Sequence, residues 1–282
     1  MEFRTLDHNA VLSILPDRDP WAHKGCFGKI LLLCGSVGFT GAAALAAKVA
    51  LRTGAGLVFL GVPQSIYAIE AIKLEEAIVF PLPEEDGKLS EEAWDDVAPR
   101  MAQMDAVLIG PGLGQSAGVL EIVRRVLQEF PGPVVVDADG INVLSAHRDI
   151  LRGRTAPTIV TPHDVEFARL GGCIGQDRAE SAAFLARDLG CIVLLKGHRS
   201  IITDGTVCYI NQTGNPGMAV GGSGDVLSGI IVSLLGQGIE PLKAAACGAW
   251  VHGAVGDLGA RELGQYGMLP SDMVQNLPRL LK

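Results

Sequence analysis

The sequence predicts a three-layer α/β/α fold, in which helices cover both faces of a mostly parallel central sheet and one antiparallel hairpin is added to it. Two observations predict the layers: short, almost wholly apolar runs recur along the chain, and longer segments of helical character separate them. Apolar runs without polar alternation are typical of strands buried on both faces, and crossover helices fit the lengths between them. A change in this pattern after Leu195 predicts the hairpin.

The expected elements follow one another along the chain. Six apolar runs are the predicted parallel strands: 29–34, 57–62, 105–109, 133–137, 158–161 and 191–195. Residues 200–203 and 207–210 then flank Asp204-Gly205, a strong turn signal for a hairpin. Helices are expected over 42–53, 226–235 and 241–263 and after Pro270. Because no repeat, low-complexity tract or long linker interrupts this order, residues 1–282 are expected to form a single domain.

Composition excludes several classes of protein. With 48% hydrophobic residues and glycines that follow no three-residue period, the chain is neither disordered nor collagen-like. The net charge of −8 predicts no nucleic acid and no anionic membrane as a partner, and no apolar stretch is long enough to span a bilayer. A polyanionic ligand must therefore be bound locally, and the 36 glycines among 282 residues supply backbone amides that can do so.

Compartment is predicted from the cysteines and the first residues. The six cysteines stand singly, without a CxxC pair. The N-terminal residues carry several charges of both signs and do not form a targeting sequence. We therefore expect a cytoplasmic protein whose cysteines are reduced core residues.

Loops that follow the apolar runs are the candidate sites, because ligands of open α/β sheets bind outside the carboxyl ends of the strands. Residues 35–41 combine glycines with a hydroxyl residue ahead of a helix, which suits either an anion or a tight strand-to-helix turn. The glycines of 110–114 either let a flat ligand approach the backbone or make a sharp turn. Asp137 and Asp139 either steer a hydrated magnesium ion, or Asp139 caps the following helix.

The most informative loop is 215–225, which reads Asn-Pro-Gly-Met-Ala-Val-Gly-Gly-Ser-Gly-Asp. Successive glycines ahead of a helix can turn several amide N–H groups toward one point and form an anion nest. Asp225 falls in the first helical turn, where the helix dipole is expected to keep it ionised. A carboxylate beside an anion nest makes sense if it accepts a proton from a hydroxyl that attacks a phosphoryl group held by the amides. The residues therefore predict phosphoryl transfer with Asp225 as the base.

These residues also carry a family resemblance. Gly221-Gly-Ser-Gly-Asp225 is similar to the anion-hole signature of the ribokinase-like superfamily. Further motifs occur in the order found in the ADP-dependent NAD(P)H-hydrate dehydratases, so that the chain resembles this family from about residue 23 to residue 278. Those motifs begin at His23, Gly35, Thr40, Arg52, Gly110, Asp137, Thr161, Leu195 and Asn215.

The resemblance implies a ribokinase-like fold and a nucleotide-repair enzyme of the hydro-lyase class. Members of the family restore NADH or NADPH from the S epimer of the hydrated nucleotide (NADHX or NADPHX) by phosphorylating its C6 hydroxyl and eliminating phosphate. Bacterial members use ADP and release AMP and phosphate, whereas eukaryotic relatives use ATP, so ADP with Mg²⁺ is the expected cofactor and ATP the alternative. The resemblance further implies a homotetramer and a separate epimerase that supplies the S form.

Roles for individual residues follow from the same resemblance. Asp225 would take the hydroxyl proton, and the amides of Gly222, Ser223 and Gly224 would hold the transferring phosphoryl group. The hydrate substrate would contact Ala42, Gly112, Gly114, His163 and Asp225. The nucleotide would contact Gly224 together with Lys196, Gly197, His198, Arg199 and Ser200. No residue is assigned as a metal ligand.

Several of these residues carry little signal without the resemblance. Taken alone, Lys196 is a solvated charge at a strand end and His163 is a helix cap or surface residue. His252 and Asp257 have the character of ordinary helix residues. Two other functions stay open: a ribokinase-like kinase of a small alcohol such as a thiazole or pyridoxal, and a non-catalytic nucleotide-sensing protein. The 110–114 loop argues against the first, and the aspartate at position 225 argues against the second.

Overall fold

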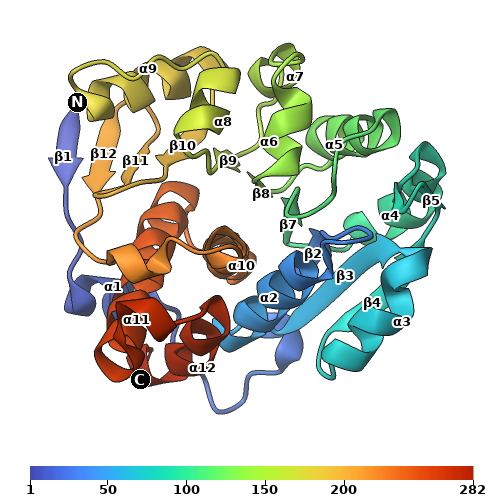
Figure 1. Ribbon diagram of the computed structural model, residues 1–282, viewed down its shortest axis with the longest axis horizontal. Helices are drawn as coiled ribbons and strands as arrows, with labels where there is room; N and C mark the ends of the chain where they lie inside the picture. Colours follow the sequence, from blue (N-terminus) through green and yellow to red (C-terminus); the bar gives the residue numbers. More distant parts are fainter. Residues whose placement is uncertain (282) are drawn as a thin grey trace.

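A ten-stranded sheet lies between two layers of helices in the computed structural model, which describes residues 1–281 (Figure 1). Its strands lie in the order β1 (Glu2–Arg4), β12 (Val207–Ile210), β11 (Ile201–Thr203), β10 (Ile192–Leu195), β9 (Thr158–Val160), β8 (Val134–Val136), β7 (Ala106–Ile109), β2 (Lys29–Leu33), β3 (Leu57–Pro63), β4 (Ile78–Leu82). Neighbouring strands are parallel, except that β11 runs antiparallel to β10 and β12. The predicted fold class, including the hairpin, is confirmed.

Helices and short turns connect these strands. A separate small hairpin consists of β5 (Glu84–Glu85) and β6 (Lys88–Leu89), and three short 3₁₀ helices cover Lys24–Phe27, Glu91–Ala93 and Pro216–Met218. The α-helices are α1 (His8–Ile14), α2 (Thr40–Arg52), α3 (Gln64–Lys73), α4 (Trp94–Met101), α5 (Ala117–Glu129), α6 (Asp139–Leu144), α7 (Asp149–Arg152), α8 (Asp164–Arg169), α9 (Arg178–Leu189), α10 (Ser223–Gly236), α11 (Pro241–Gly267) and α12 (Pro270–Leu280).

Six strands lie where the apolar runs predict them, but β1 and β4 are not among the predicted strands. All three residues of β1 are exposed, and β4 carries the exposed residues Ile78 and Pro81. These two strands form the edges of the sheet, where one side has no partner strand. The residues of β1, Glu2-Phe-Arg4, include no apolar run, whereas β4 reads Ile-Val-Phe-Pro-Leu, an apolar run whose Pro81 is typical of an edge strand.

Two hydrophobic clusters pack on opposite faces of the sheet. Ile30 and Leu32 of β2 join a cluster with α2, α10 and α11, whereas Leu31 and Leu33 join a second cluster with α4, α5 and α9. All four side chains are fully buried. Successive side chains of a strand point to opposite faces, so a run without polar residues requires cover on both sides.

Helix α10 is buried on almost all of its surface, between the sheet, α2 and α11. At Gly229 a Cβ atom would overlap Val49 and the carbonyl oxygen of Ala46 on α2, so only glycine allows the two helices to pack this closely. The close packing holds the N-terminus of α10 at the carboxyl edge of the sheet. Ser223 is the first residue of this helix, and Asp225 lies in its first turn, as the sequence predicts.

The order of the sheet reverses at β2, which has β3 on one side and β7 on the other. A crevice for ligands forms at such a reversal, outside the carboxyl ends of the strands. The loops after β2, β7 and β8 begin at this edge with residues 34, 110 and 137. The fold therefore brings the sequence-predicted loops to one place.

Two further expectations concern membranes and cysteines. In the described part of the chain, no helix has both the length and the apolar character needed to cross a bilayer. Cys34, Cys191, Cys208 and Cys247 are buried, as predicted, whereas Cys26 and Cys173 are exposed. The expectation of a core position is therefore wrong for two of the six cysteines, since Cys26 lies in the short 3₁₀ helix Lys24–Phe27 and Cys173 in the segment between α8 and α9.

Candidate active site

A glycine turn opens helix α10 and forms the centre of the candidate site. Gly222 precedes the helix with φ +97°, a left-handed conformation that favours glycine. The first amides of a helix have no intrahelical acceptor and attract anions. The Ser223 amide donates to the carbonyl oxygen of Val220 at 3.3 Å. The amides of Gly222 and Gly224 are therefore better placed to hold an anion than that of Ser223.

Asp225 is largely buried beside this turn, and its protonation differs from the sequence expectation. Burial raises the pKa of the Asp225 carboxyl to about 7, and the charges of Asp137 and Asp139 add to the rise while Lys196 opposes it. The raised pKa of Asp225 departs from the expectation that the helix dipole keeps this carboxyl ionised, because loss of solvent opposes the dipole. A carboxyl group that titrates near neutral pH is a stronger base than an ordinary aspartate.

Lys196 is not the solvated strand-end charge that its sequence position suggests. Its side chain is 21% exposed, and Nζ lies 2.9 Å from Oδ1 of Asp137 and 3.6 Å from Oε2 of Glu166. Burial lowers the pKa of Lys196, but the two carboxylates outweigh this effect and the net pKa is raised, so the ammonium stays charged. A Cβ atom on Gly224 would lie 3.7 Å from this ammonium group. A fixed positive charge therefore stands beside the glycine turn.

Asp137 connects the sheet to helix α10. Its Oδ1 accepts from the Ala138 amide at 2.8 Å, and its Oδ2 accepts from Oγ of Ser228 at 3.0 Å. Ala138 has φ +48°, a strained value for a residue with a side chain. Asp137 thus holds Lys196 on one oxygen and the second turn of α10 on the other.

The two alternatives for Asp139 are resolved against a helix cap. Asp139 is the first residue of α6, and its side chain makes no cap hydrogen bond. Instead, Oδ2 accepts from the amide of Gly114 at 2.9 Å. Among residues 1–281, no three histidine, cysteine, aspartate or glutamate side chains are grouped as metal ligands. The carboxylates therefore lie near the site without forming a closed metal cage.

The glycines of 110–114 serve close packing. A Cβ on Gly110 would overlap the carbonyl oxygen of Asp137, and one on Gly112 would lie 2.9 Å from Cβ of Ala42. The Ser36 hydroxyl donates to the Gly112 carbonyl at 2.7 Å and joins the loops after β2 and β7. Of the two substrate candidates in the loop, Gly112 is buried and Gly114 is half-buried.

We expect Gly110→Ala to destabilise the fold by about 3 kcal/mol or more, because it adds a steric overlap to a φ of +128°. Urea unfolding measures the effect. Gly238→Ala is the matched control, since Gly238 also has positive φ (+83°) but a Cβ there meets nothing within 4 Å. That variant should lose only about 1 kcal/mol, the cost of the backbone conformation alone. Equal losses would show that crowding against Asp137 has no effect.

Other glycines of the site loops face open space. A Cβ on Gly38, Gly41 or Gly221 would meet no atom within 4 Å. All three residues are exposed. Packing does not explain these glycines, so their backbones are free for a ligand to approach.

The residues 196–200 form a turn at the end of β10. The Ser200 hydroxyl donates to the Gly197 carbonyl at 3.0 Å, and Arg199 has φ +55°. His198 and Arg199 are exposed, and they line a pocket of about 380 Å³ together with the first residues of α9. Of the five residues of this turn that are assigned to the nucleotide, Lys196 is the one that lies close to the glycine turn, near Gly224.

His163 has the role that its sequence position suggests. It caps α8: Nδ1 accepts from the amides of Val165 and Glu166 at 3.1 and 3.3 Å, and Glu166 accepts from the His163 amide at 2.9 Å. The side chain is 52% exposed. Because Glu166 also faces Lys196, the cap lies next to the charged cluster of the site.

Two site residues were missed, since His252 and Asp257 are not ordinary helix residues. Asp257 accepts from the Gly214 amide and from Nδ2 of Asn215, both at 2.9 Å. His252 Nε2 lies 2.9 Å from the carbonyl oxygen of Ser223. The only sequence signal for this role is that both are polar residues in the otherwise apolar stretch 244–260. Helix α11 thus holds the loop at 214–218 and the glycine turn.

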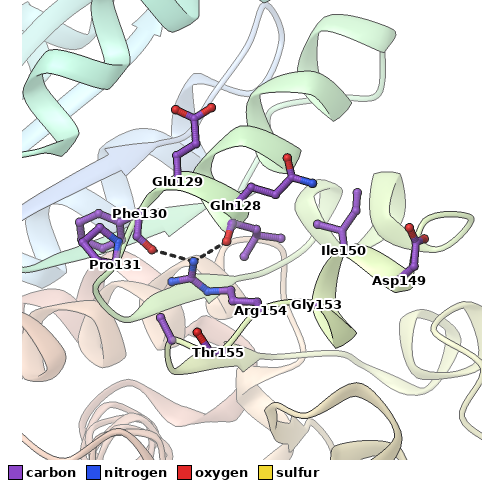
Figure 2. Close-up of a pocket in the computed structure, with 11 residues that line it drawn as sticks. Gln128, Glu129, Phe130, Pro131, Asp149, Ile150, Gly153, Arg154 and Thr155 are labelled. Carbon is purple, nitrogen blue, oxygen red and sulfur yellow. Dashed lines mark hydrogen bonds between the residues drawn. The ribbon is translucent and has the colours of Figure 1, made fainter.

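Figure 2 shows a larger cavity of about 510 Å³, which is not part of this site. It lies between the end of α5 and the segment before β9, at the amino ends of the parallel strands. Its only buried charge is that of Arg154, whose guanidinium donates to the carbonyl oxygens of Leu127, Phe130 and Gly132. Burial lowers the pKa of Arg154 to about 10. Because backbone carbonyls occupy this guanidinium, the cavity offers little to an anion.

Comparisons with known proteins agree with this geometry. The sequence profile described as NAD(P)H-hydrate dehydratase matches residues 30–279. The chain is 46% identical over 277 residues to a bifunctional NAD(P)H-hydrate repair enzyme of Moorella thermoacetica, covering 96% of this chain and 52% of that protein. It is 37% identical to the ADP-dependent (S)-NAD(P)H-hydrate dehydratase of Neisseria meningitidis, covering 84% of this chain and 79% of that one. The chain thus spans about half the length of the bifunctional relatives.

Solved structures give the same assignment. An ADP/ATP-dependent NAD(P)H-hydrate dehydratase from Bacillus subtilis, co-crystallised with ATP and Mg²⁺, has a TM-score of 0.81 at 32% identity, with 97% of this chain and 96% of that chain covered. A ribokinase-like superfamily protein from Enterococcus faecalis has a TM-score of 0.87 at 28% identity, with 99% and 95% covered. The chain has a ribokinase-like fold and belongs to the NAD(P)H-hydrate dehydratase family.

Proposed function

We propose that this protein dehydrates the S epimer of NAD(P)H hydrate with ADP, restoring NADH or NADPH and releasing AMP and phosphate. The observation that carries the proposal is the position of Asp225 in the first turn of α10, beside the open glycine turn and the partly buried Lys196 ammonium. Phosphoryl transfer requires mainly positioning and charge stabilisation, and this arrangement supplies a base, amide donors and a fixed positive charge.

The reaction balances in two steps. Asp225 accepts the proton of the C6 hydroxyl, whose oxygen bonds to the β-phosphorus of ADP while the bond from that phosphorus to AMP breaks. Phosphate, a far better leaving group than hydroxide, then departs from C6 as a proton leaves the neighbouring ring carbon, and the ring double bond forms. The amides of Gly222 and Gly224 and the Lys196 ammonium would stabilise the charge on the transferring phosphoryl group.

Further assignments are part of the same proposal. The 196–200 turn would bind the nucleotide, and the open glycines with Ala42, Gly114 and His163 would line the hydrate site. Mg²⁺ would arrive with the nucleotide, held by phosphate oxygens and waters near the Asp137 and Asp139 carboxylates, since this ion usually keeps several waters. It would neutralise phosphate charge. We also propose a cytoplasmic homotetramer, each chain one domain, that receives the S form from a separate epimerase.

An absorbance assay tests the function. The protein is mixed with hydrated NADH, Mg²⁺ and either ADP or ATP, and the return of dihydronicotinamide absorbance is followed. Recovery with ADP supports the proposal, and the ratio of the ADP and ATP rates gives the nucleotide preference. A stable phosphate ester without recovery would indicate a kinase of a small alcohol, and nucleotide binding without any turnover would indicate a sensor.

The pH dependence of this reaction should report the protonation of Asp225. Because the base must be deprotonated, and because burial raises the pKa of Asp225 to about 7, we expect kcat/KM to fall about tenfold per pH unit below neutrality and to level off above it. The profile is measured from about pH 5 to pH 9, with enzyme stability checked at each pH. If kcat/KM instead falls only near pH 4, where an ordinary aspartate titrates, burial does not raise the pKa of Asp225.

A further inference from the structure

Helix α11 contacts the glycine turn through His252. His252, which is partly buried on this helix, places Nε2 2.9 Å from the carbonyl oxygen of Ser223 and 3.2 Å from its Oγ. A carbonyl oxygen can only accept, so Nε2 carries a proton and donates it to this oxygen. Burial lowers the pKa of His252 to about 4, which keeps the imidazole neutral at physiological pH.

This hydrogen bond acts on the peptide unit that carries the phosphoryl-binding amide. The Ser223 carbonyl and the Gly224 N–H belong to one planar trans peptide, in which the oxygen and the amide hydrogen point in opposite directions. A donor that fixes the Ser223 oxygen therefore also aims the Gly224 N–H, on the opposite side. Hydrogen bonding to the oxygen also polarises the peptide and strengthens its N–H as a donor.

The glycine turn needs such a support. Gly221 is exposed with no atom within 4 Å of a Cβ position, and Gly222 and Gly224 also lack side chains that could hold the backbone. Glycine-rich backbone is flexible, and the first turn of a helix frays. Helix α11 itself is anchored close by, because a Cβ on Gly253 would overlap Thr213. His252 thus provides a hydrogen-bond donor on a tightly packed helix next to a flexible turn.

We propose that His252 is a positioning residue, which holds the Ser223–Gly224 peptide so that the Gly224 amide points at the transferring phosphoryl group. The proposal rests on the phosphoryl transfer proposed above, but it concerns only the nucleotide side of the reaction. His252 does not touch the substrate in this mechanism, and its effect passes through the backbone of Ser223.

Two substitutions separate the hydrogen bond from the packing of the ring. His252→Gln keeps an N–H donor near the position of Nε2, whereas His252→Phe keeps the bulk without a donor. For His252→Phe we expect kcat to fall about tenfold or more, the loss of one strong hydrogen bond, with the KM for ADP unchanged within about a factor of two. His252→Gln should recover most of that loss. His147→Gln, at an exposed residue before α7, is the matched control and should behave as wild type.

A binding measurement makes the inference independent of the hydrate substrate. The affinity of AMP with aluminium fluoride, which mimics the β-phosphoryl group of ADP during its transfer, is compared with that of AMP alone by calorimetry. His252→Phe should weaken the first about tenfold and spare the second. This loss in an enzyme that fails the absorbance assay would refute the proposed function and support the inference. Equal losses in the Phe and Gln variants, or a parallel loss of affinity for AMP alone with a lower Tm, would reduce His252 to a packing residue.

Discussion

Asp225→Asn is expected to lower kcat by about 10²–10⁴-fold, the usual range for loss of a general base. Asparagine has nearly the same shape and keeps the first turn of α10, but it cannot accept the hydroxyl proton. ADP binding should stay nearly unchanged, since the amides of Gly222 and Gly224 and the Lys196 ammonium remain. Steady-state kinetics give kcat, and calorimetry gives the Kd for ADP. A full loss of ADP binding, or an Asn variant with full activity, would refute the assignment of the base.

The same variant makes a thermodynamic prediction. The raised pKa of Asp225 in the folded protein means that its contribution to stability is present below the ordinary pKa of 3.8 and is lost as pH rises through about 7. Asparagine carries no charge, so Asp225→Asn should be more stable than wild type at pH 8, and its advantage should disappear in acid. Asp95→Asn, at an exposed aspartate in the first turn of α4, controls for the substitution and should change neither stability nor turnover.

Lys196→Met is expected to destabilise the fold by about 3 kcal/mol, because it leaves the buried Asp137 and Glu166 carboxylates without their common partner. It should also lower kcat/KM, since the positive charge beside the glycine turn is lost. The acid limb of the pH profile of kcat/KM should move to higher pH, because the Lys196 charge lowers the pKa of Asp225 in wild type. Urea unfolding measures the first effect and the pH dependence of kcat/KM the other two.

A double-mutant cycle with Asp137→Asn identifies the cause of that loss. If the ion pair is responsible, the double variant should be less destabilised than the sum of the single variants, by about 1–3 kcal/mol. Additive losses would contradict the pairing and leave only packing. Lys243→Met, at an exposed lysine of α11, is the matched control for the change from lysine to methionine and should leave stability within about 0.5 kcal/mol of wild type.

Local sequence patterns were sufficient for the layers of the fold and for the centre of the site. Six apolar runs predicted the buried strands because burial on both faces leaves no polar position, and Asp204-Gly205 predicted the hairpin because few residues adopt its turn. Strand β1 was not predicted because its exposed residues include two charged side chains, and β4 was missed although its residues form an apolar run. Asp225 was placed correctly because glycines and a helix start are local features.

Only the tertiary structure decided the electrostatics of the site. Lys196 and Asp137 lie 59 positions apart, and Ser228 and Asp137 lie 91 apart, so no local pattern reveals that they meet. The pKa of Asp225 depends on the burial and the neighbouring carboxylates that this meeting creates. His252 and Asp257 acquire their roles in the same way, since helix α11 crosses behind loops that are distant in sequence. The sequence by itself indicated Asp225 and the glycine turn as the candidate centre of the site, and the packing determined the charges around them, because charge interactions depend on distances in space.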